Sequence, residues 1–412
     1  MPTPLPSLPN DPLRWARGSL LARRPQGVRP VTPSRFLVTS SSGHGASYEV
    51  NLLLDSWSCT CQDFVTRGLP CKHAYAVREA LVGVSPTPVP LPRRPTYAQN
   101  WPAYNRAQLA EERLFPRLLS ELVFPLKDPR PTASTGRPRL PLSDTLFCAL
   151  LKVNSQLSLR RAYGRFEDAR THRHIRTLPS FVQPSLLFRR EDLTASFHEL
   201  IATSARPLAD WERRFAVDAT GLRTTSFGSY CQEAHGASRQ NIWLKLHVIL
   251  GIESQIIPGV VVTASNENDT PQFPALVEAA RGAGFQLHEI LGDKGYLSRR
   301  NMDVAGAVGA TPYIPFKKDS TGMAAGSAMW HRMYRFFTDH REEFEHHYHQ
   351  RSNVEATFAA LKKKLGETLR SKDPVARVNE VLAKVICHNL MVLIHEMHEH
   401  QISPRFLRGR KV

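Results

Sequence analysis

Residues 348–362 are the stretch that most limits how this chain can fold, because their pattern predicts a helix with two different faces. The stretch contains Ala and Leu but no Gly or Pro, as helices favour. At about 100° per residue, three polar side chains fall within roughly 40° of Glu355: Tyr348, Arg351 and Lys362. Apolar side chains follow on the next face at the spacing of a core stripe: Val354, Phe358, Leu361 and Leu365. We therefore expect one side of this helix to pack against a core and the next to present a carboxylate flanked by cations.

Two aspartates upstream stand at the ends of apolar runs. Asp218 follows Phe215-Ala216-Val217, and Asp293 follows Ile290-Leu291-Gly292. Both runs predict buried strands that end in a carboxylate, and the glycines nearby would let a metal or a phosphate approach the backbone closely. A hard divalent cation takes oxygen ligands from several parts of a chain, so these aspartates and Glu355 form a candidate metal site.

The three acidic residues, with the spacing Tyr-x2-Arg-x3-Glu-x6-Lys around the last, resemble the DDE transposases of bacterial insertion sequences, in the branch named for that four-residue signature. The resemblance covers about residues 136–399, and further matching segments are 265–271, 379–384 and 387–390. It implies an RNase H-like catalytic domain. It also implies a DNA transposase that binds terminal inverted repeats and catalyses strand cleavage and strand transfer in cut-and-paste transposition.

The resemblance also implies roles for single residues. Three would be catalytic and would hold two Mg2+ ions, with Mn2+ as a substitute: Asp218, Asp293 and Glu355. Three would bind DNA, the arginine through its planar fork and the lysine as a point charge: Tyr348, Arg351 and Lys362. The implied partners are double-stranded DNA, as transposon ends and as target, and a second copy of the chain in the DNA complex.

Two other interpretations fit the same residues. A domesticated nuclease or recombination factor would keep the three carboxylates and lose mobility. A zinc-dependent DNA-binding or interaction protein would carry an idle catalytic domain. Inverted repeats flanking the gene argue against the first, and a Mg2+-dependent nicking assay tests the second.

A second local signal is the pattern Cys-x-Cys, nine intervening residues, then Cys-x-His, with ligands Cys59, Cys61, Cys71 and His73. Three sulfurs and one imidazole suit tetrahedral zinc. The order resembles the SWIM-type zinc finger, which implies a preceding β-hairpin and a following helix. The alternative is incidental cysteines in a reduced protein. The other thiols, Cys148, Cys231 and Cys387, stand apart and are expected to be packed or incidental.

The charge and apolar patterning favour one cellular setting. Lys and Arg exceed Asp and Glu by 54 − 37 = 17, which suggests a polyanionic partner, although a basic protein without one is the alternative. No apolar run reaches the roughly 18 residues of a membrane span, and the start of the chain lacks the apolar core of a signal peptide. We expect a cytoplasmic, nucleoid-associated protein with no membrane partner.

The expected fold class is mixed α/β, with a small zinc-finger domain and a helical domain ahead of the RNase H-like domain. The predicted divisions are a flexible basic arm (residues 1–33), a zinc finger (34–83), a Pro-rich linker (84–108), a helical region (109–210), a catalytic domain (211–399) and a basic tail (400–412). By resemblance the helical region would bind the DNA ends. Its plainer role is to support the catalytic core or a dimer.

Within the catalytic domain the apolar runs predict strands at residues 215–218, 243–251, 255–262, 287–291 and 311–315, the second and third antiparallel. The segment from Lys294 to Val354 leaves 61 residues between the second aspartate and the glutamate, too few for the large β-rich insertion of some family members. We expect helix over residues 326–350 instead, which puts a hairpin-forming cleavage route in doubt.

Trp330 is predicted to pack in the core rather than to stack on a base. Asp269 and Glu267 are predicted as capping or supporting groups.

Overall fold

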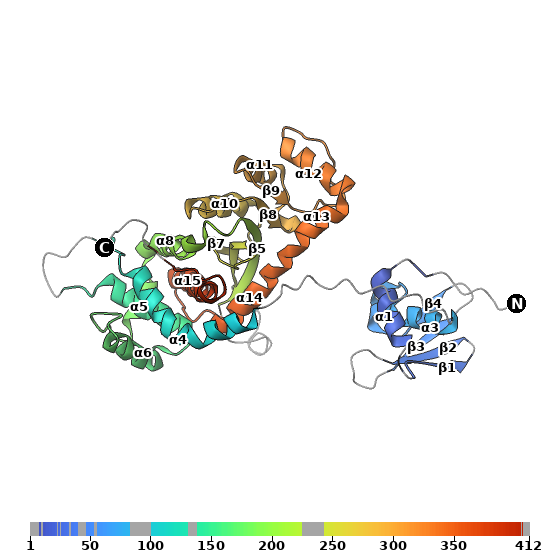
Figure 1. The fold of residues 1–412 in the computed structure, drawn as a ribbon, viewed down its shortest axis with the longest axis horizontal. Coiled ribbons are helices and arrows are strands. Elements are labelled where there is room, and N and C mark those ends of the chain that lie inside the picture. The colour runs from blue at the N-terminus through green and yellow to red at the C-terminus, as the bar shows by residue number, and fades with distance from the viewer. Residues whose placement is uncertain are drawn as a thin grey trace, which may run out of the picture. The chain divides into compact units, whose positions relative to one another are not determined.

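The computed structural model divides the chain into two compact units, Met1–Ala98 and Gln99–Val412. It describes residues 8–9, 11–22, 24, 26–32, 34–39, 47–52, 56–82, 100–130, 138–224, 243–404 and 406. Most of the predicted Pro-rich linker, residues 84–99, lies outside the described residues, and each unit is treated by itself below (Figure 1).

The first unit is an antiparallel sheet covered by helices. Its strand order is β1-β2-β3-β4, with the bounds Val28–Thr32, Arg35–Thr39, Ser47–Leu52 and Trp57–Cys59. The pairing of β2 with β3, Phe36 opposite Val50, confirms the predicted hairpin. Its helices are α1 Pro12–Ala22, α2 Gln62–Arg67 and α3 Lys72–Val82.

The prediction of a flexible arm over residues 1–33 is wrong for its described part. Helix α1 packs on α3, and Leu21 is fully buried in the core of this unit. A Cβ on Gly18 would lie 2.7 Å from the carbonyl oxygen of Lys72, so only glycine lets the two helices approach this closely. Many prolines and arginines pointed to disorder, but a few apolar side chains and one close helix contact order the segment.

The second unit contains a mixed five-stranded sheet of order β7-β6-β5-β8-β9. The strands in chain order are β5 Arg214–Arg223, β6 Trp243–Gly251, β7 Gly259–Ala264, β8 Glu289–Gly292 and β9 Thr311–Tyr313. Strand β6 runs antiparallel to β5 and β7, whereas β8 runs parallel to β5 and β9. The predicted mixed sheet is confirmed, and this is an RNase H-like arrangement.

Helices make up the rest of the second unit. Those ahead of the sheet are α4 Trp101–Val123, α5 Leu142–Ser155, α6 Leu159–Thr171, α7 Gln183–Phe188 and α8 Thr194–Ala205. Those after β7 are α10 Phe273–Gly282, α11 Arg299–Ala307, α12 Ala328–Asp339, α13 Arg341–Tyr348, α14 Ser352–Leu365 and α15 Pro374–Glu399. Helix α10 packs on β6 and β7, α13 on β8 and β9, and α14 on β5.

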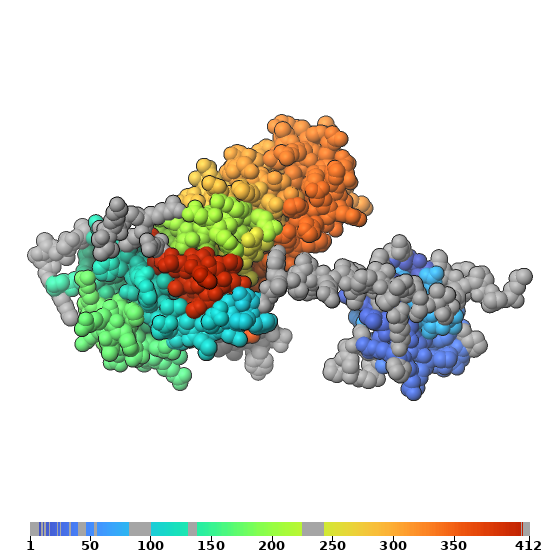
Figure 2. Space-filling view, viewed as in Figure 1, coloured from blue at the N-terminus to red at the C-terminus, as the bar shows by residue number. Residues whose placement is uncertain are grey.

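Helix α15 is the centre of the helical region, seen end-on between α4, α5 and α8 in Figure 1. It also contacts α7 and β7, and its side chains from Val381 to Ile394 are almost all buried. In Figure 2 its red atoms reach the surface between the cyan of α4 and the yellow-green of α8 and β5. The sequence had predicted a domain boundary at residue 210. Because α15 contacts both the earlier helices and the sheet, the structure instead forms one compact unit across that residue.

By length and mean hydropathy α15 is the one helix of the described chain that could cross a membrane. However, 89 % of its apolar window is buried inside the protein, which is what a core helix requires. The sequence-based search for an apolar run had missed it.

The start of α4 corrects another boundary. The helix begins at Trp101 rather than near residue 109, because the Asn100 side chain accepts a hydrogen bond from the N–H of Ala103 and Pro102 occupies the first turn. It continues through Pro116, and neighbours such as Phe115 and Leu119 are buried. At the other end, Phe406 of the predicted tail is buried against the core.

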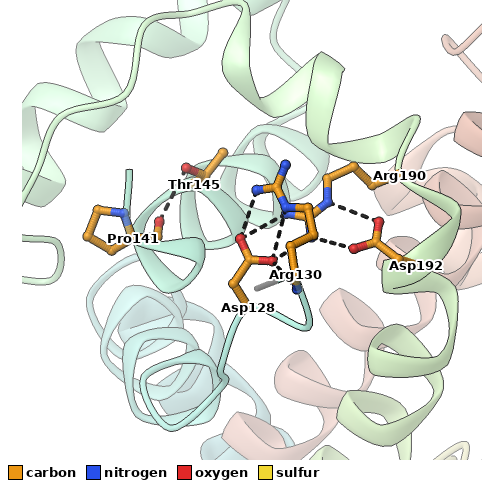
Figure 3. Close-up of polar contacts among 6 residues, drawn as sticks. All are labelled: Asp128, Arg130, Pro141, Thr145, Arg190 and Asp192. Atoms are coloured by element: carbon orange, nitrogen blue, oxygen red, sulfur yellow. Dashed lines mark hydrogen bonds and ion pairs between the residues drawn. The ribbon is translucent and has the colours of Figure 1, made fainter. Parts of the chain in front are cut away.

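An arginine cluster ties the end of α4 to the turn between α7 and α8 (Figure 3). Arg190 donates to Asp128 at 2.7 Å and to Asp192 at 2.5 Å, while Arg130 donates to Asp128 at 2.8 Å. Hydrogen bonds from Arg130, and then from Arg190, hold the pKa of the Asp128 carboxyl well below its usual range. A carboxylate that accepts charge-assisted hydrogen bonds from two guanidinium groups stabilises the folded state.

We predict that Asp128→Asn lowers the free energy of unfolding by about 2 kcal/mol at pH 7, because two charge-assisted contacts are lost. Since the folded pKa is depressed, the contribution is complete above the unfolded pKa of about 4 and declines as the pH falls below it. Urea unfolding at pH 7 and pH 3 should therefore show a smaller difference at pH 3. Glu121→Gln, which removes an exposed pair with Arg117, is the control and should change little.

Candidate active site and metal centre

Four ligand atoms meet in the core of the first unit. Cys59 ends β4, Cys61 precedes α2, and Cys71 and His73 lie at the start of α3. All four side chains are buried, and their ligand atoms lie within 4.8 Å of one another. The Nδ1 atom of His73 lies 3.7 Å from the sulfur of Cys59 and 3.6 Å from that of Cys71. The predicted set of ligands is therefore assembled.

The imidazole orientation shows which nitrogen would bind a metal. Nδ1 of His73 faces the sulfurs, whereas Nε2 is buried without a hydrogen-bond partner. Hydrogen bonding from Cys59 lowers the pKa of the Cys71 thiol, so Cys71 is the thiol most ready to become a thiolate. Three sulfurs and one imidazole nitrogen at this spacing fit a structural Zn2+. Cys148 and Cys387 are buried free thiols in the other unit, and Cys231 lies outside the described residues.

The sheet of the second unit places two aspartates side by side. In the parallel pair β5 and β8, Val217 is opposite Gly292, and Asp218 and Asp293 follow these two residues. Neighbouring strands lie roughly 4.8 Å apart. Strand β5 continues to Arg223, so Asp218 lies within the strand and not at its end, as the sequence had suggested. Only β8 ends there, so Asp293 follows the last residue of its strand.

Backbone amides fix one oxygen of each carboxylate. The N–H of Ala219 donates to Oδ1 of Asp218 at 2.8 Å, and the N–H of Gly295 donates to Oδ1 of Asp293 at 2.8 Å. Burial raises the pKa of Asp218, and the nearby charge of Asp293 adds to this effect. The guanidinium of Arg351 opposes it, so a cation offsets the cost of a buried carboxylate.

Arg351 links the strands to the helix that carries Glu355. Its Nη1 donates to Oδ2 of Asp218, and its Nη2 lies 3.8 Å from Oε1 of Glu355. The guanidinium carbon lies 6.0 Å from the ring centre of Tyr348. Tyr348 and Glu355 therefore both lie near Arg351, which contacts Asp218. Lys362 lies, half-buried, further along α14.

The predicted single helix over residues 348–362 is interrupted. Tyr348 ends α13, a 3-10 turn covers His349–Arg351, and α14 begins at Ser352. A 3-10 turn rotates by about 120° per residue rather than 100°, so the common face predicted for a uniform helix is distorted. Glu355 lies in the first turn of α14 with its side chain 74 % exposed.

Other polar side chains surround the two aspartates. Oδ1 of Asp269 lies 2.5 Å from Nζ of Lys245 and 3.4 Å from Nδ1 of His247. Asp269 and Asp293 both lie within 3.4 Å of the position that a Cβ on Gly295 would occupy. Tyr296 is buried beside these carboxylates, and its hydroxyl has no hydrogen-bond partner among the residues that the structure describes. Burial, and then the charge of Asp269, raises the pKa of this tyrosine.

The three predicted catalytic carboxylates do not form a closed cluster here. Within the described ranges, only the Cys3His group has all its ligand atoms within 4.8 Å. Asp218 and Asp293 are adjacent, whereas Glu355 is joined to them through Arg351.

Comparison with protein families places each of these two sites within a known domain. Residues 212–390 match the family model of the transposase DDE domain, and residues 48–81 match that of the SWIM zinc finger. The chain carries a DDE transposase domain. The DDE domain spans the sheet, the two aspartates and Glu355, and the SWIM finger spans the four metal ligands.

Sequence reasoning missed part of the DDE domain's polar surroundings. Lys245 and His247 lie two residues apart in β6, and this alternation could have placed them on one face of the sheet. Tyr296 belongs to the Gly-Asp-x-Gly-Tyr segment, but nothing in that motif shows that its hydroxyl is buried. Trp330 is buried and donates through Nε1 to the carbonyl of Thr321 at 2.8 Å, which agrees with the predicted packing role.

We predict that zinc removal unfolds the SWIM finger, because the free energy of zinc binding is part of the folding free energy of such a small core. Cys59→Ala and His73→Ala should each reduce the bound zinc from one equivalent to near zero, as measured by atomic emission on purified protein. Protease cleavage within residues 56–82 should then accelerate. Cys148→Ala is the control and should retain its zinc, and full zinc retention in His73→Ala would contradict the assignment.

Proposed function

We propose that this protein is a DNA transposase that binds the terminal inverted repeats of a mobile element and catalyses strand cleavage and strand transfer by a cut-and-paste route. The observation that carries the proposal is the adjacency of Asp218 and Asp293 at neighbouring parallel strands, with Arg351 between Asp218 and Glu355. The DDE domain match supports the same chemistry.

Asp218, Asp293 and Glu355 would hold two Mg2+ ions, with Mn2+ as a substitute. Hard carboxylate oxygens fit these cations, and Tyr296 places a buried hydroxyl, without a hydrogen-bond partner among the described residues, near Asp218 and Asp293. When bound, the metals would activate a water or a 3′-hydroxyl and stabilise the leaving oxygen at phosphorus. The chain's own part is to orient Asp218 and Asp293 through the amides of Ala219 and Gly295.

DNA recognition is assigned to cationic side chains. Arg351 and Lys362 would meet phosphate oxygens near the catalytic carboxylates, and Tyr348 would hydrogen-bond a phosphate or stack on a base. In the helical region, α5 and α6 are joined by a three-residue turn, and α6 exposes Arg160, Arg161 and Arg165. A net charge of +17 supports a polyanionic partner. We assign this helical region to the transposon ends.

The binding partners and the cellular location of the protein follow from the same proposal. Joining two ends requires at least two copies of the chain in the DNA complex, so we propose a homodimer there. A cytoplasmic, nucleoid-associated location without a membrane partner fits this activity. One observation favours the rival, a zinc-dependent DNA-binding protein with an inactive DDE domain: the three carboxylates do not share one 4.8 Å cluster in the described chain.

We expect Asp218→Asn, Asp293→Asn and Glu355→Gln each to reduce Mg2+-dependent cleavage of end-containing DNA by roughly a thousandfold or more, because each removes a metal ligand worth several kcal/mol in the transition state. Gel-shift affinity for the same DNA should remain. Glu278→Gln, on the exposed side of α10, is the matched control and should cleave normally. Unchanged cleavage in the three variants would refute the catalytic roles, and no cleavage by the unmodified protein would favour the rival.

Arg351→Met gives an independent test of the metal site. Without the guanidinium the two aspartates repel each other, so the variant should melt at a lower temperature in EDTA. Mg2+ should then raise its Tm more than it raises that of the unmodified protein, because the ions replace the lost positive charge. Arg341→Met, on the exposed side of α13, is the control. Equal Mg2+-induced shifts in both proteins would argue against a metal site at Asp218.

A further inference from the structure

A basic cavity lies in the second unit, formed by helices that the proposed chemistry does not use. Its volume is about 360 Å3, and its lining comes from α5, the start of α6, the end of α7 and the loop before α15. An adjoining cavity of about 270 Å3 shares Lys152 and Arg370 with it. The polar residues of the larger cavity are Lys152, Ser158, Ser185, Arg189, Arg370, Ser371, Lys372 and Asp373.

Lys152 is the unusual member of this lining. It is only 8 % exposed and lies in both cavity linings, and among the described residues its ammonium group makes no direct hydrogen bond, although the charge of Glu380 acts on it. Glu380 lines the adjoining cavity, but its carboxylate already accepts the backbone N–H groups of Arg370 and Ser371, at 3.0 Å and 2.8 Å. A largely buried ammonium that makes no direct hydrogen bond is stabilised when a ligand supplies a negative charge at hydrogen-bond distance.

A second buried lysine shows the contrast. Lys384, at the adjoining cavity, donates to the carbonyl oxygens of Gly366 at 2.5 Å and Thr368 at 3.3 Å. Lys384 is therefore satisfied by the protein, whereas Lys152 is not. The two lysines give a matched pair in which only one needs an external partner.

Among the other charged residues that line the larger cavity, three are cations and one is a carboxylate. Arg189, Arg370 and Lys372 are exposed at its edge, and the guanidinium of Arg370 also donates to the carbonyl of Leu157 at 2.9 Å. The only carboxylate in this lining, Asp373, accepts the N–H of Ala376 at 3.0 Å as the cap of α15. The N-termini of α6 and α15, which carry partial positive charge, both adjoin the cavity.

We propose that this cavity binds a phosphate group of the DNA backbone, with Lys152 as its buried cation and Arg189, Arg370 and Lys372 around it. The inference rests on the proposed function for the source of the phosphate. DNA is the favoured source because α6 begins at the cavity and exposes arginines along its length, so a backbone held by α6 passes this point. The cavity would fix the position of the duplex and would carry no base specificity.

The first experiment uses the full-length protein and inorganic phosphate. Phosphate should raise the Tm of the unmodified protein but not that of Lys152→Met. Lys152→Met without ligand should melt at the same temperature or higher, because it removes an unpaired buried charge. Lys384→Met should melt lower and keep its phosphate-induced shift. A lower Tm for Lys152→Met combined with an unchanged phosphate-induced shift would overturn the proposal.

The second experiment measures affinity for duplex DNA as a function of salt. Lys152→Met should weaken binding to end-containing and unrelated duplexes by the same factor and reduce the salt slope by about 1. Lys152→Arg should retain most of the affinity. An unchanged slope in Lys152→Met would overturn the assignment to DNA.

The two experiments also distinguish a failure of this inference from a failure of the proposed function. If the unmodified protein bound no DNA, the transposase proposal would fail. Phosphate stabilisation that depends on Lys152 would then show a site for free phosphate. No such stabilisation would remove the phosphate site as well.

Discussion

The pairing of β5 with β8 is the constraint on which the catalytic part of the molecule depends. Parallel register sets Val217 opposite Gly292 and so brings Asp218 and Asp293 together from positions far apart in the chain. Two carboxylates at this separation repel each other, and burial adds to the cost. Arg351 offsets that cost in the described structure, and the same residue reaches toward Glu355. The acidic site is therefore held together by a cation from the 3-10 turn directly before α14, the helix that carries Glu355.

The SWIM finger has to be stable with only a small hydrophobic core. Its core comprises one short sheet, three helices and a small set of buried side chains, among which are the four ligands themselves. A core this small needs a metal or another cross-link to be stable. The close contact of α1 with α3 at Gly18 extends the core into residues that looked unstructured by composition. Metal binding and helix packing together replace the apolar area that a larger domain would bury.

The parts of the structure that sequence predicted well are those with local patterns. The Cys-x-Cys and Cys-x-His spacing pointed to the four ligands, and the apolar runs ending at Asp218 and Asp293 pointed to the strands of the sheet. What sequence could not give depends on tertiary contacts. The 3-10 turn at His349–Arg351, the ion pair between Arg351 and Asp218, and the isolation of Lys152 have no local signature. The order in the described part of residues 11–32 was missed because composition favoured disorder, whereas α1 packs closely on α3.

The far end of β5 has one further contact with a broad consequence. Arg223 exchanges backbone hydrogen bonds with Glu367 and Leu369, at 3.0 Å and 2.7 Å, so the strand that carries Asp218 also anchors the segment leading into the basic cavity. One strand therefore fixes two places at once: the backbone around Asp218 and the segment at residues 367–369. A substitution that breaks the contact of Arg223 would loosen that segment and the outer half of β5 together.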